Sequence, residues 1–389
     1  MHQDLVTVIY ARALEPAIAA AEVAGQSVRA HVNGRLAAVF GSDAIVVDPE
    51  TAGRSLAEVA RAGAGLLMVD GRAWFAPGTT LHARLAQTGT RPLRLVALSG
   101  AEHAPETLAV LLGAGFFAAE HAVLAAPLVE ACARVLAGGA DLAQDAITLA
   151  CDGALVDGFD DVAAIEAAVL LERARAAMQA GVRLRDPSRT YIRGTLTCGA
   201  GVTIDADVIV EGDVVLGDGV RVDAHCVLSG SRVGEGTWIK AFSIVEDAAV
   251  ASRSVVGPYA RLRPGTILGE RCQIGNFVEI KSSTIGDGAR INHHSFVGDA
   301  VLEEAVTLGA GCITCNHDGT KTNATFIGRG AYVGSGCQLV APVRIGRGAT
   351  IGAGSTITRD VPDATLAVAR ARQATIGDWR GPRSNRDET

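Results

Sequence analysis

The second half of the chain repeats a six-residue pattern of apolar and polar positions. From Gly201 to about Pro362, an aliphatic residue is followed by Gly, Asp or Glu, then by two variable residues and a small one. The aliphatic positions include Ile204, Val210, Leu216, Val222, Leu268, Ile274, Ile345 and Ile351. Such a short repeat is typical of a solenoid, because each unit buries its apolar edge only by stacking on its neighbours. We expect a left-handed parallel β-helix in which three hexads form one triangular coil of about 18 residues.

The repeat has two kinds of interruption. Some steps have five residues instead of six, at Leu228 to Val233, Ile280 to Ile285 and Val297 to Leu302. Gly, Asp and Asn at the corners tolerate positive φ, so the coil continues through such steps. The pattern lapses completely over Asn316–Phe326, which predicts a loop that projects from one corner. Loops of this kind often carry function.

The first half follows a different pattern. Short apolar runs at Leu5–Ile9, Gly65–Val69 and Leu93–Leu98 predict buried strands, and Leu14–Ala24 and Pro127–Leu136 predict helices. This alternation indicates an α/β domain.

A long helix is expected between the two halves, over Asp160–Ala180, with an Asp N-cap and Gly181 at its C-terminal end. The expected organisation is an α/β domain over 1–158, a linker helix and connection over 159–190, the β-helix over 191–362 and a tail over 363–389.

Composition narrows the classes of function. The formal net charge is −7, which argues against nucleic acid as a main partner because phosphate neutralisation needs a basic face. No apolar stretch has the length of a membrane helix, and Met1–Tyr10 lacks the basic residues of a secretory signal. We therefore expect a cytoplasmic protein without membrane insertion.

A metal site is one interpretation of the Cys and His residues. Cys312 and Cys315 form a C-x-x-C motif, and His293, His294 and His317 are near them in the sequence. The second C-x-x-C motif that would complete a structural zinc site is absent. We interpret both cysteines as small residues of the repeat and expect no metal.

Several longer segments carry a resemblance to a known family. They are Arg183–Leu196, Gly257–Gly265, Ile274–Lys281, Leu308–Gly319 and Leu339–Val343. Together they resemble the acetyltransferase domain of the bifunctional glucosamine-1-phosphate N-acetyltransferase and N-acetylglucosamine-1-phosphate uridyltransferase family, which makes UDP-N-acetylglucosamine for the cell envelope. The resemblance runs without a gap for about 100 residues from Arg263 and continues to Trp379.

The resemblance implies an acetyl-CoA-dependent enzyme and assigns roles to residues. Arg263 and Lys281 match a clamp on the sugar phosphate, His293 the general base and Glu279 a carboxylate in the same pocket. The positions that match the acetyl-CoA groove are Ala310, Asn316, His317, Ser335, Ala353 and Arg370. The family works as a homotrimer in which each groove is completed by a neighbouring subunit.

The residue types support these roles without the resemblance. Arg263 and Lys281 are one coil apart, so they should stack, and two stacked cations suit a phosphate. An amine attacks a thioester only when it is unprotonated, so an imidazole such as that of His293 is a suitable base. We expect all three side chains to face one side of the prism, beside a crevice shared with an adjoining protomer.

Lysine is rare in this chain. Among 35 basic residues only Lys240, Lys281 and Lys321 are lysines, and Lys281 stands at the expected phosphate position. A compact ammonium differs chemically from a planar guanidinium, which supports a specific role there. Lys321 lies in the projecting loop and could reach a phosphate in a neighbouring subunit.

Two acceptor positions depart from the family. Phe296 stands where the family usually has Tyr, and Thr307 where it usually has Asn; His317 replaces a Tyr after Asn316. The loss of hydrogen-bonding groups at a sugar site changes which sugar binds. A buried polar group of the ligand that is left without a hydrogen bond costs binding free energy. The acceptor could therefore be an amino sugar phosphate other than glucosamine-1-phosphate.

The N-terminal half resembles a shortened nucleotidyltransferase that lacks key groups. In Leu66–Pro77, Arg72 occupies the position of a metal-binding Asp, where a cation would repel Mg²⁺. Tyr10–Ala13 stands where the family has a Gly-rich phosphate loop, and the first 239 residues contain no lysine. Asp160 alone matches a metal position. We expect this domain to be degenerate, with uridylyl transfer lost.

Three hypotheses follow. The first is an N-acetyltransferase of an amino sugar phosphate, with oxyanion stabilisation from backbone N–H groups near Ala310 or Ser335. The second is a β-helical metalloenzyme of the carbonic anhydrase type that uses His293, His294 and His317. The third is a non-catalytic protein that binds a sugar nucleotide or CoA.

Overall fold

The computed structural model describes the second half of the chain continuously and the first half in segments. The described residues are 6–10, 20–23, 26–27, 30, 45–47, 65–69, 73–75, 93–97, 107–113, 147–151, 153–155 and 158–375. The chain divides into two compact units, Met1–Ala180 with Thr190–Gly194, and Gly181–Arg189 with Thr195–Thr389. Each unit is described by itself.

The first unit contains a mixed six-stranded sheet. Its strands, in spatial order, are β4 (Ile45–Val47), β1 (Val6–Tyr10), β5 (Gly65–Val69), β8 (Thr107–Gly113), β7 (Leu93–Ala97) and β9 (Ile147–Cys151). β1 pairs in parallel with β4 and β5, and β8 runs antiparallel to β5 and β7. Two further pairs are β6 (Ala73–Phe75) with β10 (Gly153–Leu155), and β2 (Glu22–Val23) with β3 (Gln26–Ser27).

The three strands expected from the sequence are confirmed, at β1, β5 and β7, to within one residue at each end. The helix expected over Leu14–Ala24 is wrong at its end, because β2 occupies Glu22–Val23. Residues 14–19 and 24 of that segment lie outside the described residues. So does the expected helix Pro127–Leu136.

The long helix α9 spans Phe159–Gln179. Its N-cap is Gly158 and not the expected Asp, because the helix begins one residue earlier than predicted. Asp161 instead reaches back and accepts a hydrogen bond from the Gly158 N–H at 2.9 Å. Gly181, with a φ of 98°, follows the last turn as expected. Among the described residues, no helix is long and apolar enough to cross a membrane.

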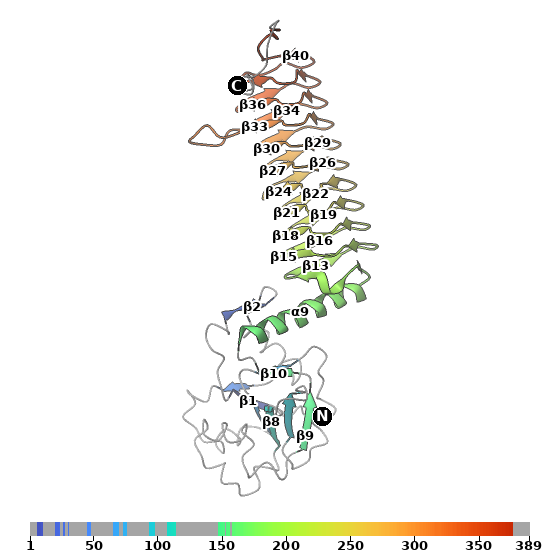
Figure 1. The fold of residues 1–389 in the computed structure, drawn as a ribbon, viewed down its shortest axis with the longest axis vertical. Helices are drawn as coiled ribbons and strands as arrows, with labels where there is room; N and C mark the ends of the chain where they lie inside the picture. Colours follow the sequence, from blue (N-terminus) through green and yellow to red (C-terminus); the bar gives the residue numbers. More distant parts are fainter. Residues whose placement is uncertain are drawn as a thin grey trace, which may run out of the picture. The chain divides into compact units, whose positions relative to one another are not determined.

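The second unit is a β-helix with three parallel sheets, whose coils stack one on another (Figure 1). Face 1 consists of β11 (Arg183–Leu184), β14 (Thr203–Ile204), β17 (Arg221–Val222), β20 (Trp238–Ile239), β23 (Val255–Val256), β26 (Gln273–Asn276), β29 (Arg290–His293), β32 (Thr307–Leu308), β35 (Tyr332–Val333), β38 (Thr350–Ile351) and β40 (Leu366–Ala367).

The other two sheets have the same parallel order. Face 2 contains β15 (Val208–Glu211), β18 (Val227–Ser229), β21 (Ile244–Glu246), β24 (Arg261–Leu262), β27 (Glu279–Lys281), β30 (Phe296–Gly298), β33 (Ile313–Cys315), β36 (Gln338–Val340) and β39 (Thr356–Ile357). Face 3 contains β13 (Thr195–Cys198), β16 (Asp213–Leu216), β19 (Arg232–Val233), β22 (Ala249–Val250), β25 (Ile267–Leu268), β28 (Thr284–Ile285), β31 (Ala300–Leu302), β34 (Thr325–Ile327) and β37 (Val343–Ile345). Strand β12 (Thr190–Ile192) and the one-turn helix η2 (Pro187–Arg189) precede them.

The aliphatic positions of the repeat form the core. Ile204, Val210, Leu228, Ile239 and Ile280 are fully buried, each stacked on its equivalent in the next coil. The five-residue steps are also confirmed, because Leu216 pairs with Val233 and Ile285 with Leu302, one residue short of a full coil. The sequence period therefore predicted both the inward positions and the register.

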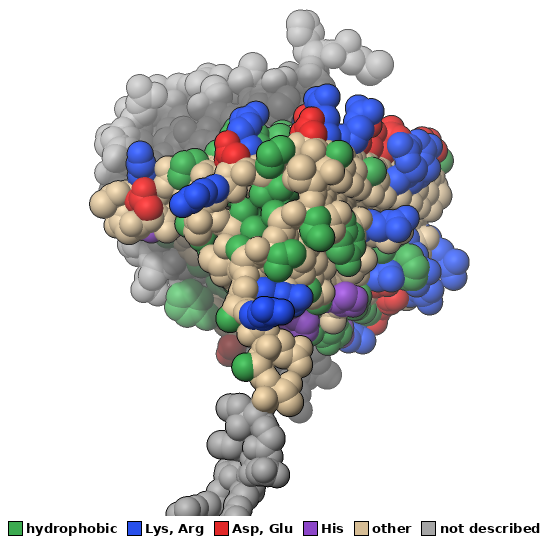
Figure 2. Space-filling view, turned by 90° about the horizontal axis from the view of Figure 1, so that it is seen from above, with side chains coloured by type: hydrophobic (Ala, Val, Ile, Leu, Met, Phe, Trp, Pro, Cys, Tyr) green, Lys and Arg blue, Asp and Glu red, His purple; other side chains and the backbone are tan. Residues whose placement is uncertain are grey.

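The three corners differ in what they carry. Between faces 1 and 2, His225, Phe242, Tyr259, Phe277 and His294 adopt positive φ and stack with ring centroids 4.7 to 5.3 Å apart. Between faces 2 and 3, the segment after β33 leaves the coil as the predicted projecting loop (Figure 1). Seen end-on from above, side chains of both charges are intermixed around the rim (Figure 2).

Burial of the inward row predicts where the coil is vulnerable. We expect Leu228→Ala to lower the free energy of unfolding by about 2–5 kcal/mol, because the removed methyl groups leave a cavity between stacked coils. Urea unfolding followed by circular dichroism measures the change. Ile267→Ala is the matched control, since Ile267 is an outward aliphatic residue 52% exposed. Equal losses in the two variants would contradict the assignment of the core.

Candidate functional site

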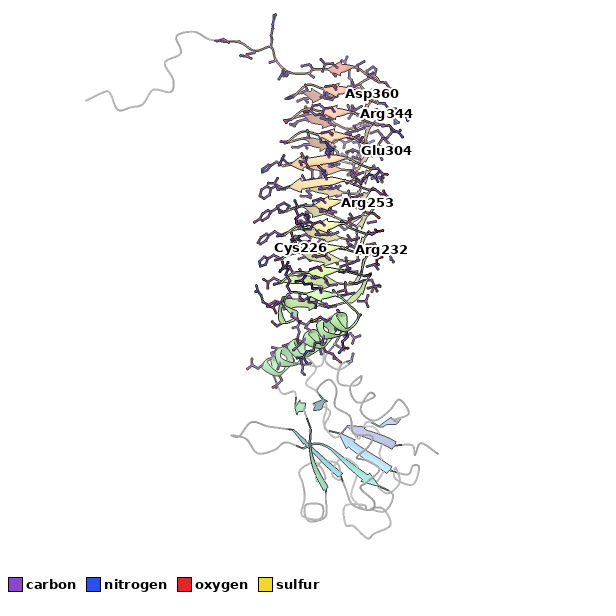
Figure 3. All side chains as sticks on the ribbon, turned by 90° about the vertical axis from the view of Figure 1, so that its right-hand side faces the viewer. Cys226, Arg232, Arg253, Glu304, Arg344 and Asp360 are labelled. Carbon is purple, nitrogen blue, oxygen red and sulfur yellow. The ribbon has the colours of Figure 1, made fainter. Side chains whose placement is uncertain are left out.

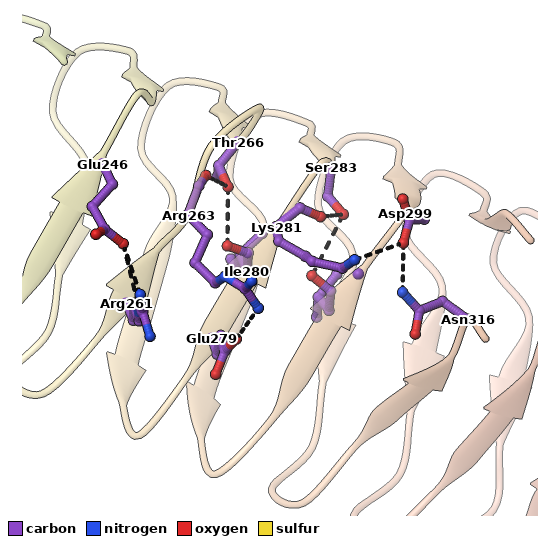
Figure 4. Close-up of polar contacts among 12 residues, drawn as sticks. Glu246, Arg261, Arg263, Thr266, Glu279, Ile280, Lys281, Ser283, Asp299 and Asn316 are labelled. Carbon is purple, nitrogen blue, oxygen red and sulfur yellow. Dashed lines mark hydrogen bonds and ion pairs between the residues drawn. The ribbon is translucent and has the colours of Figure 1, made fainter. Parts of the chain in front are cut away.

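The two cations expected to bind a phosphate stack on face 2, near its edge with face 3. Arg263 directly follows β24 and Lys281 ends β27, and the pairing of Leu262 with Ile280 places them one above the other. Arg263 Nη1 donates to Glu279 Oε1 at 2.7 Å, and Lys281 Nζ lies 3.4 Å from Asp299 Oδ2 (Figure 4). Each cation therefore faces a carboxylate of its own chain.

Asp299 is a member of this cluster that the sequence reasoning missed. Its carboxylate also accepts a hydrogen bond from Asn316 Nδ2 (Figure 4), and Asn316 is buried. The signal was available, because Asp299 lies one coil from both Lys281 and Asn316. Asn316 was expected in the cofactor groove, but in this chain it contacts the cluster on face 2.

Phe296 borders the same cluster. It begins β30, and a Cβ built on Gly298 would lie 2.8 Å from Phe296 Cζ, so the ring lies over this glycine. Gly298 pairs with Lys281. The ring thus covers the backbone beside the Lys281–Asp299–Asn316 contacts.

His293 ends β29 and lies at the corner between faces 1 and 2. Its ladder partner is Asn276, and His293 Nδ1 lies 2.8 Å from Asn276 Oδ1. An amide oxygen can only accept, so Nδ1 is the donor in this contact, and in a neutral imidazole the lone pair is then on Nε2. Asn276 was not singled out from the sequence. The side chain of His293 is exposed, so Nε2 is accessible to a substrate.

The expectation that His293 faces the same side as the two cations is not met. His293 lies at the end of a face 1 strand, whereas Arg263 and Lys281 lie at the opposite edge of face 2. The sequence period distinguishes inward from outward positions, but it does not by itself bring residues on different edges of a triangle together. Within one chain His293 and the two cations are therefore separated.

A column of small residues continues from His293 along this corner. Backbone hydrogen bonds link it step by step: Gly311 N–H donates to His293 O, Gly336 N–H to Ala310 O and Gly354 N–H to Ser335 O. The next members are thus Ala310, Ser335 and Ala353, all of which are exposed. At the far end, Arg370 Nη1 donates to Ala353 O at 3.0 Å.

The column also offers backbone donors. At the corner between faces 3 and 1, the N–H groups of Ala200 and Glu270 each donate to an Asp Oδ1 of the next coil, at 2.8 Å. Within residues 158–375, the N–H groups of Ala310, Ser335 and Ala353 have no such acceptor, because alanine or serine occupies the stacked position. A ligand that lies in this column would meet unpaired N–H donors.

The remaining expected residues lie apart from these groups in one chain. Thr307 begins β32 on face 1, and His317 and Lys321 lie in the projecting loop. Asp318 holds this loop: its carboxylate accepts from the Lys321 N–H, the Asn323 side chain and the Thr320 N–H and hydroxyl. The same hydrogen bonds, the Lys321 N–H first, hold the pKa of Asp318 well below its usual range. Asp318 thus stays ionised, and the turn intact, at any pH near neutrality.

The cysteine motif does not form a chelate. Cys312 is buried, and its Sγ donates to Gly334 O at 3.2 Å, whereas Cys315 belongs to the outward row of face 2. Burial raises the pKa of Cys312 to about 11, so it is not a thiolate at neutral pH. In the continuous stretch 158–375, no three His, Cys, Asp or Glu side chains are grouped as a metal site would require.

Some expectations about the N-terminal domain fall on residues outside the described ones. They concern Arg72 and residues 11–13. Asp160 lies exposed in the first turn of α9.

Known proteins are similar to this chain both in the hexapeptide repeat and in sequence. Residues 188–271 match the GMPPB C-terminal domain, and residues 324–359 match the bacterial transferase hexapeptide (six repeats) family. Bifunctional protein GlmU of Alkalilimnicola ehrlichii is 39% identical over 385 residues, which are 95% of this chain and 81% of that protein. GlmU of Cellvibrio japonicus is 51% identical over 54% of this chain and 47% of its own length. Among solved structures, a mutant of perosamine N-acetyltransferase from Caulobacter crescentus in complex with CoA and GDP-perosamine is 32% identical over 30% of this chain and 53% of its own, with a TM-score of 0.27.

The β-helix of hexapeptide repeats, with an exposed imidazole at the foot of a column of small residues, defines an acyltransferase of the hexapeptide class. Within this class, the chain belongs to the family of bifunctional protein GlmU.

The contact between Asn276 and His293 predicts how the imidazole is oriented. We expect Asn276→Leu to lower kcat about tenfold, because Nδ1 loses the acceptor that fixes its proton. Asn276→Asp should instead move the acidic limb of the pH–rate profile to higher pH by about one unit, because a carboxylate favours the charged imidazolium. Profiles of kcat/KM against pH measure both effects. If the Asp variant has the profile of the parent, Asn276 does not orient the base.

Proposed function

We propose that this protein transfers the acetyl group of acetyl-CoA to the amine of an amino sugar phosphate, with glucosamine-1-phosphate as the first candidate acceptor. The observation that carries the proposal is the His293 imidazole, held by Asn276 at the foot of a column of unpaired backbone N–H groups. Membership of the GlmU family supports the same reaction.

The chemistry follows from these positions. Acetyl-CoA would lie along Ala310, Ser335 and Ala353, with its thioester beside His293. The amine nitrogen attacks the thioester carbonyl carbon, and an N–H group of the column stabilises the oxyanion that forms. His293 Nε2 accepts one proton from the attacking amine. The carbon–sulfur bond then breaks, and the sulfur leaves with that proton as the thiol of CoA.

The acceptor-side residues support a site shared between subunits. Glu279, Lys281, Phe296 and Asn316 lie on face 2, whereas Thr307 lies on face 1 and His293 at the corner. These groups surround one ligand only if face 2 of one protomer meets face 1 of another. We therefore propose a homotrimer, with Lys321 of the projecting loop reaching the neighbouring site. Light scattering that gives the mass of one chain would contradict the trimer.

The experiment that tests the function measures release of the CoA thiol from acetyl-CoA with a series of amino sugar phosphates. Glucosamine-1-phosphate and its 2-hydroxy counterpart, glucose-1-phosphate, form a matched pair, because the second lacks the attacking amine. Release with the first and not with the second supports N-acetylation. If no member of the series releases thiol although CoA binds, the non-catalytic hypothesis replaces this proposal.

We further propose that uridylyl transfer is lost and that the protein acts in the cytoplasm. Arg72, in the place of a metal-binding Asp, supports the loss, as does the absence of lysine from the first 239 residues. Incubation with UTP, Mg²⁺ and N-acetylglucosamine-1-phosphate tests it. Formation of pyrophosphate at a rate comparable with acetyl transfer would overturn this part.

A further inference from the structure

Asp299 lies where the cluster of charged residues on face 2 meets the projecting loop. One carboxylate oxygen, Oδ2, faces Lys281 Nζ at 3.4 Å and also accepts a hydrogen bond from Asn316 Nδ2 (Figure 4). Lys281 is one of the two cations expected to bind the acceptor phosphate. Asn316 directly follows β33 and is the first residue of the loop. A single carboxylate therefore contacts both the phosphate cation and the root of the loop.

The other end of the loop is also held by Asp299. The Thr325 N–H donates to Asp299 O at 3.2 Å, and Thr325 begins β34, where it pairs with Ala300. This strand is fixed in the coil. The guanidinium of Arg344, in the next coil (Figure 3), lies 4.5 Å from the ring centroid of Phe326. Both ends of the loop thus meet at one residue.

Between its two ends the loop is bonded to itself. The Asn323 N–H donates to Asn316 O at 2.7 Å, and His317 and Thr322 form an antiparallel β-bridge. The Asp318 carboxylate accepts hydrogen bonds from the residues of the turn, as described above. A loop that is closed by its own hydrogen bonds keeps its shape, so the direction in which it projects depends on how its ends are held.

The backbone beside Asp299 leaves room for the Asn316 amide. A Cβ on Gly298 would lie 2.7 Å from Asn316 Nδ2, so only glycine fits there. The Gly298 N–H donates to Thr314 Oγ1 at 2.8 Å, which fixes this backbone. A carboxylate can only accept, so the amide must direct its Nδ2 at Asp299. Asn316 is only 8% exposed, and a charge-assisted hydrogen bond at such a site is strong.

The loop carries Lys321 near its middle, where this residue is exposed. In the proposed trimer, Lys321 reaches the site of a neighbouring subunit. Attraction between an exposed ammonium and a phosphate falls quickly with distance, because water and salt screen it. The contribution of Lys321 therefore depends on the direction in which the loop leaves its corner.

We propose that Asp299 is a positioning residue for the acceptor site of the neighbouring subunit. It fixes the projecting loop, and through the loop it places the Lys321 ammonium beside the acceptor phosphate. Its contact with Lys281 joins the loop to the charged cluster of its own subunit. The proposal rests on the proposed N-acetyltransferase function and on the proposed trimer.

Two substitutions of Asp299 separate its side-chain contacts. Asp299→Asn keeps an oxygen that can accept from Asn316 but removes the charge that faces Lys281. Asp299→Gly removes both contacts. The backbone tolerates this change, because Asp299 has a φ of 50° and Gly230, at the same corner of an earlier coil, has a φ of 53°. Asp247→Gly is the matched control, since Asp247 is exposed at this corner with a φ of 42°.

Steady-state kinetics with glucosamine-1-phosphate tests the role of Asp299. We expect the KM for this acceptor to be about tenfold higher in Asp299→Gly than in Asp299→Asn, because only the first variant loses the hydrogen bond that holds the loop. In a Lys321→Met background the two variants should differ by less than about twofold, since the loop then has no cation to place. Asp247→Gly should keep the parent KM within about twofold. A difference that is unchanged in the Lys321→Met background would overturn the proposal.

Hydrogen exchange separates this proposal from the function on which it rests. We expect amide exchange in residues 317–323 of the full-length protein to be at least tenfold faster in Asp299→Gly than in the parent, and unchanged in Asp247→Gly. Mass spectrometry of the peptides that contain the loop measures it. This result in a protein that acetylates no acceptor would support the anchoring by Asp299 and remove the proposed reaction. Equal exchange in Asp299→Gly and the parent would overturn the anchoring.

Discussion

Replacement of His293 by Ala is expected to lower the rate of CoA release by about 10²–10⁴, the contribution typical of a positioned general base. His293 Nδ1 is held by Asn276, so Nε2 is the ring nitrogen left to accept a proton in the proposed reaction. The loss should appear in kcat, since the side chain acts on the proton that moves in the transition state and does little for ground-state binding. Steady-state kinetics at saturating acetyl-CoA measures it.

His294→Ala is the control for this variant. His294 is the adjacent imidazole, but it belongs to the stack of aromatic rings, with its centroid 4.9 Å from that of Phe277. We expect the activity of His294→Ala to remain within about threefold of the parent, because His294 ends a stack of rings and does not belong to the column of Ala310, Ser335 and Ala353. If His293→Ala retains more than a tenth of the parent rate, or if the two variants lose activity equally, His293 is not the base.

The coil was predictable from the sequence because its physics is local and periodic. Each inward residue, such as Leu228 or Ile280, stacks on the residue one coil away, so a period of six fixes burial and register together. Even the shortened coil at Leu216 and Val233 follows from counting aliphatic positions. Less of the α/β unit could be predicted from the sequence. Its sheet pairs strands that are far apart in the sequence, such as β1 with β5, and no short period specifies such contacts.

The sequence predicted candidate residues of the site, but it did not predict which of them lie together in one chain. Counting by coils stacks Arg263 on Lys281, as the structure does. It does not reveal that the His293 side chain turns towards Asn276, because that contact depends on which way the side chain leaves the corner.

Obstruction of the proposed acetyl-CoA groove is the other change for which we expect a large effect. Ala353→Phe should raise the KM for acetyl-CoA about 30-fold or more, because a ring at this position would fill a column whose other members are Ala310 and Ser335 and would cover the unpaired N–H groups there. The effect on kcat at saturation should be small, since Ala353 lies three coils from the base. Initial rates over a range of acetyl-CoA concentrations separate the two parameters.

Ala200 offers a control with the same local sequence. Gly199-Ala200-Gly201 and Gly352-Ala353-Gly354 are identical tripeptides at corners, and their last glycines have φ values of 70° and 71°. Ala200, however, lies at the corner between faces 3 and 1, and its N–H already donates to Asp218. Ala200→Phe should therefore leave the KM for acetyl-CoA within about twofold, while it imposes the same added ring on the same backbone. An equal rise of the KM for acetyl-CoA in both variants would mean that the added ring distorts the coil. The column between faces 1 and 2 would then not be the binding site of acetyl-CoA.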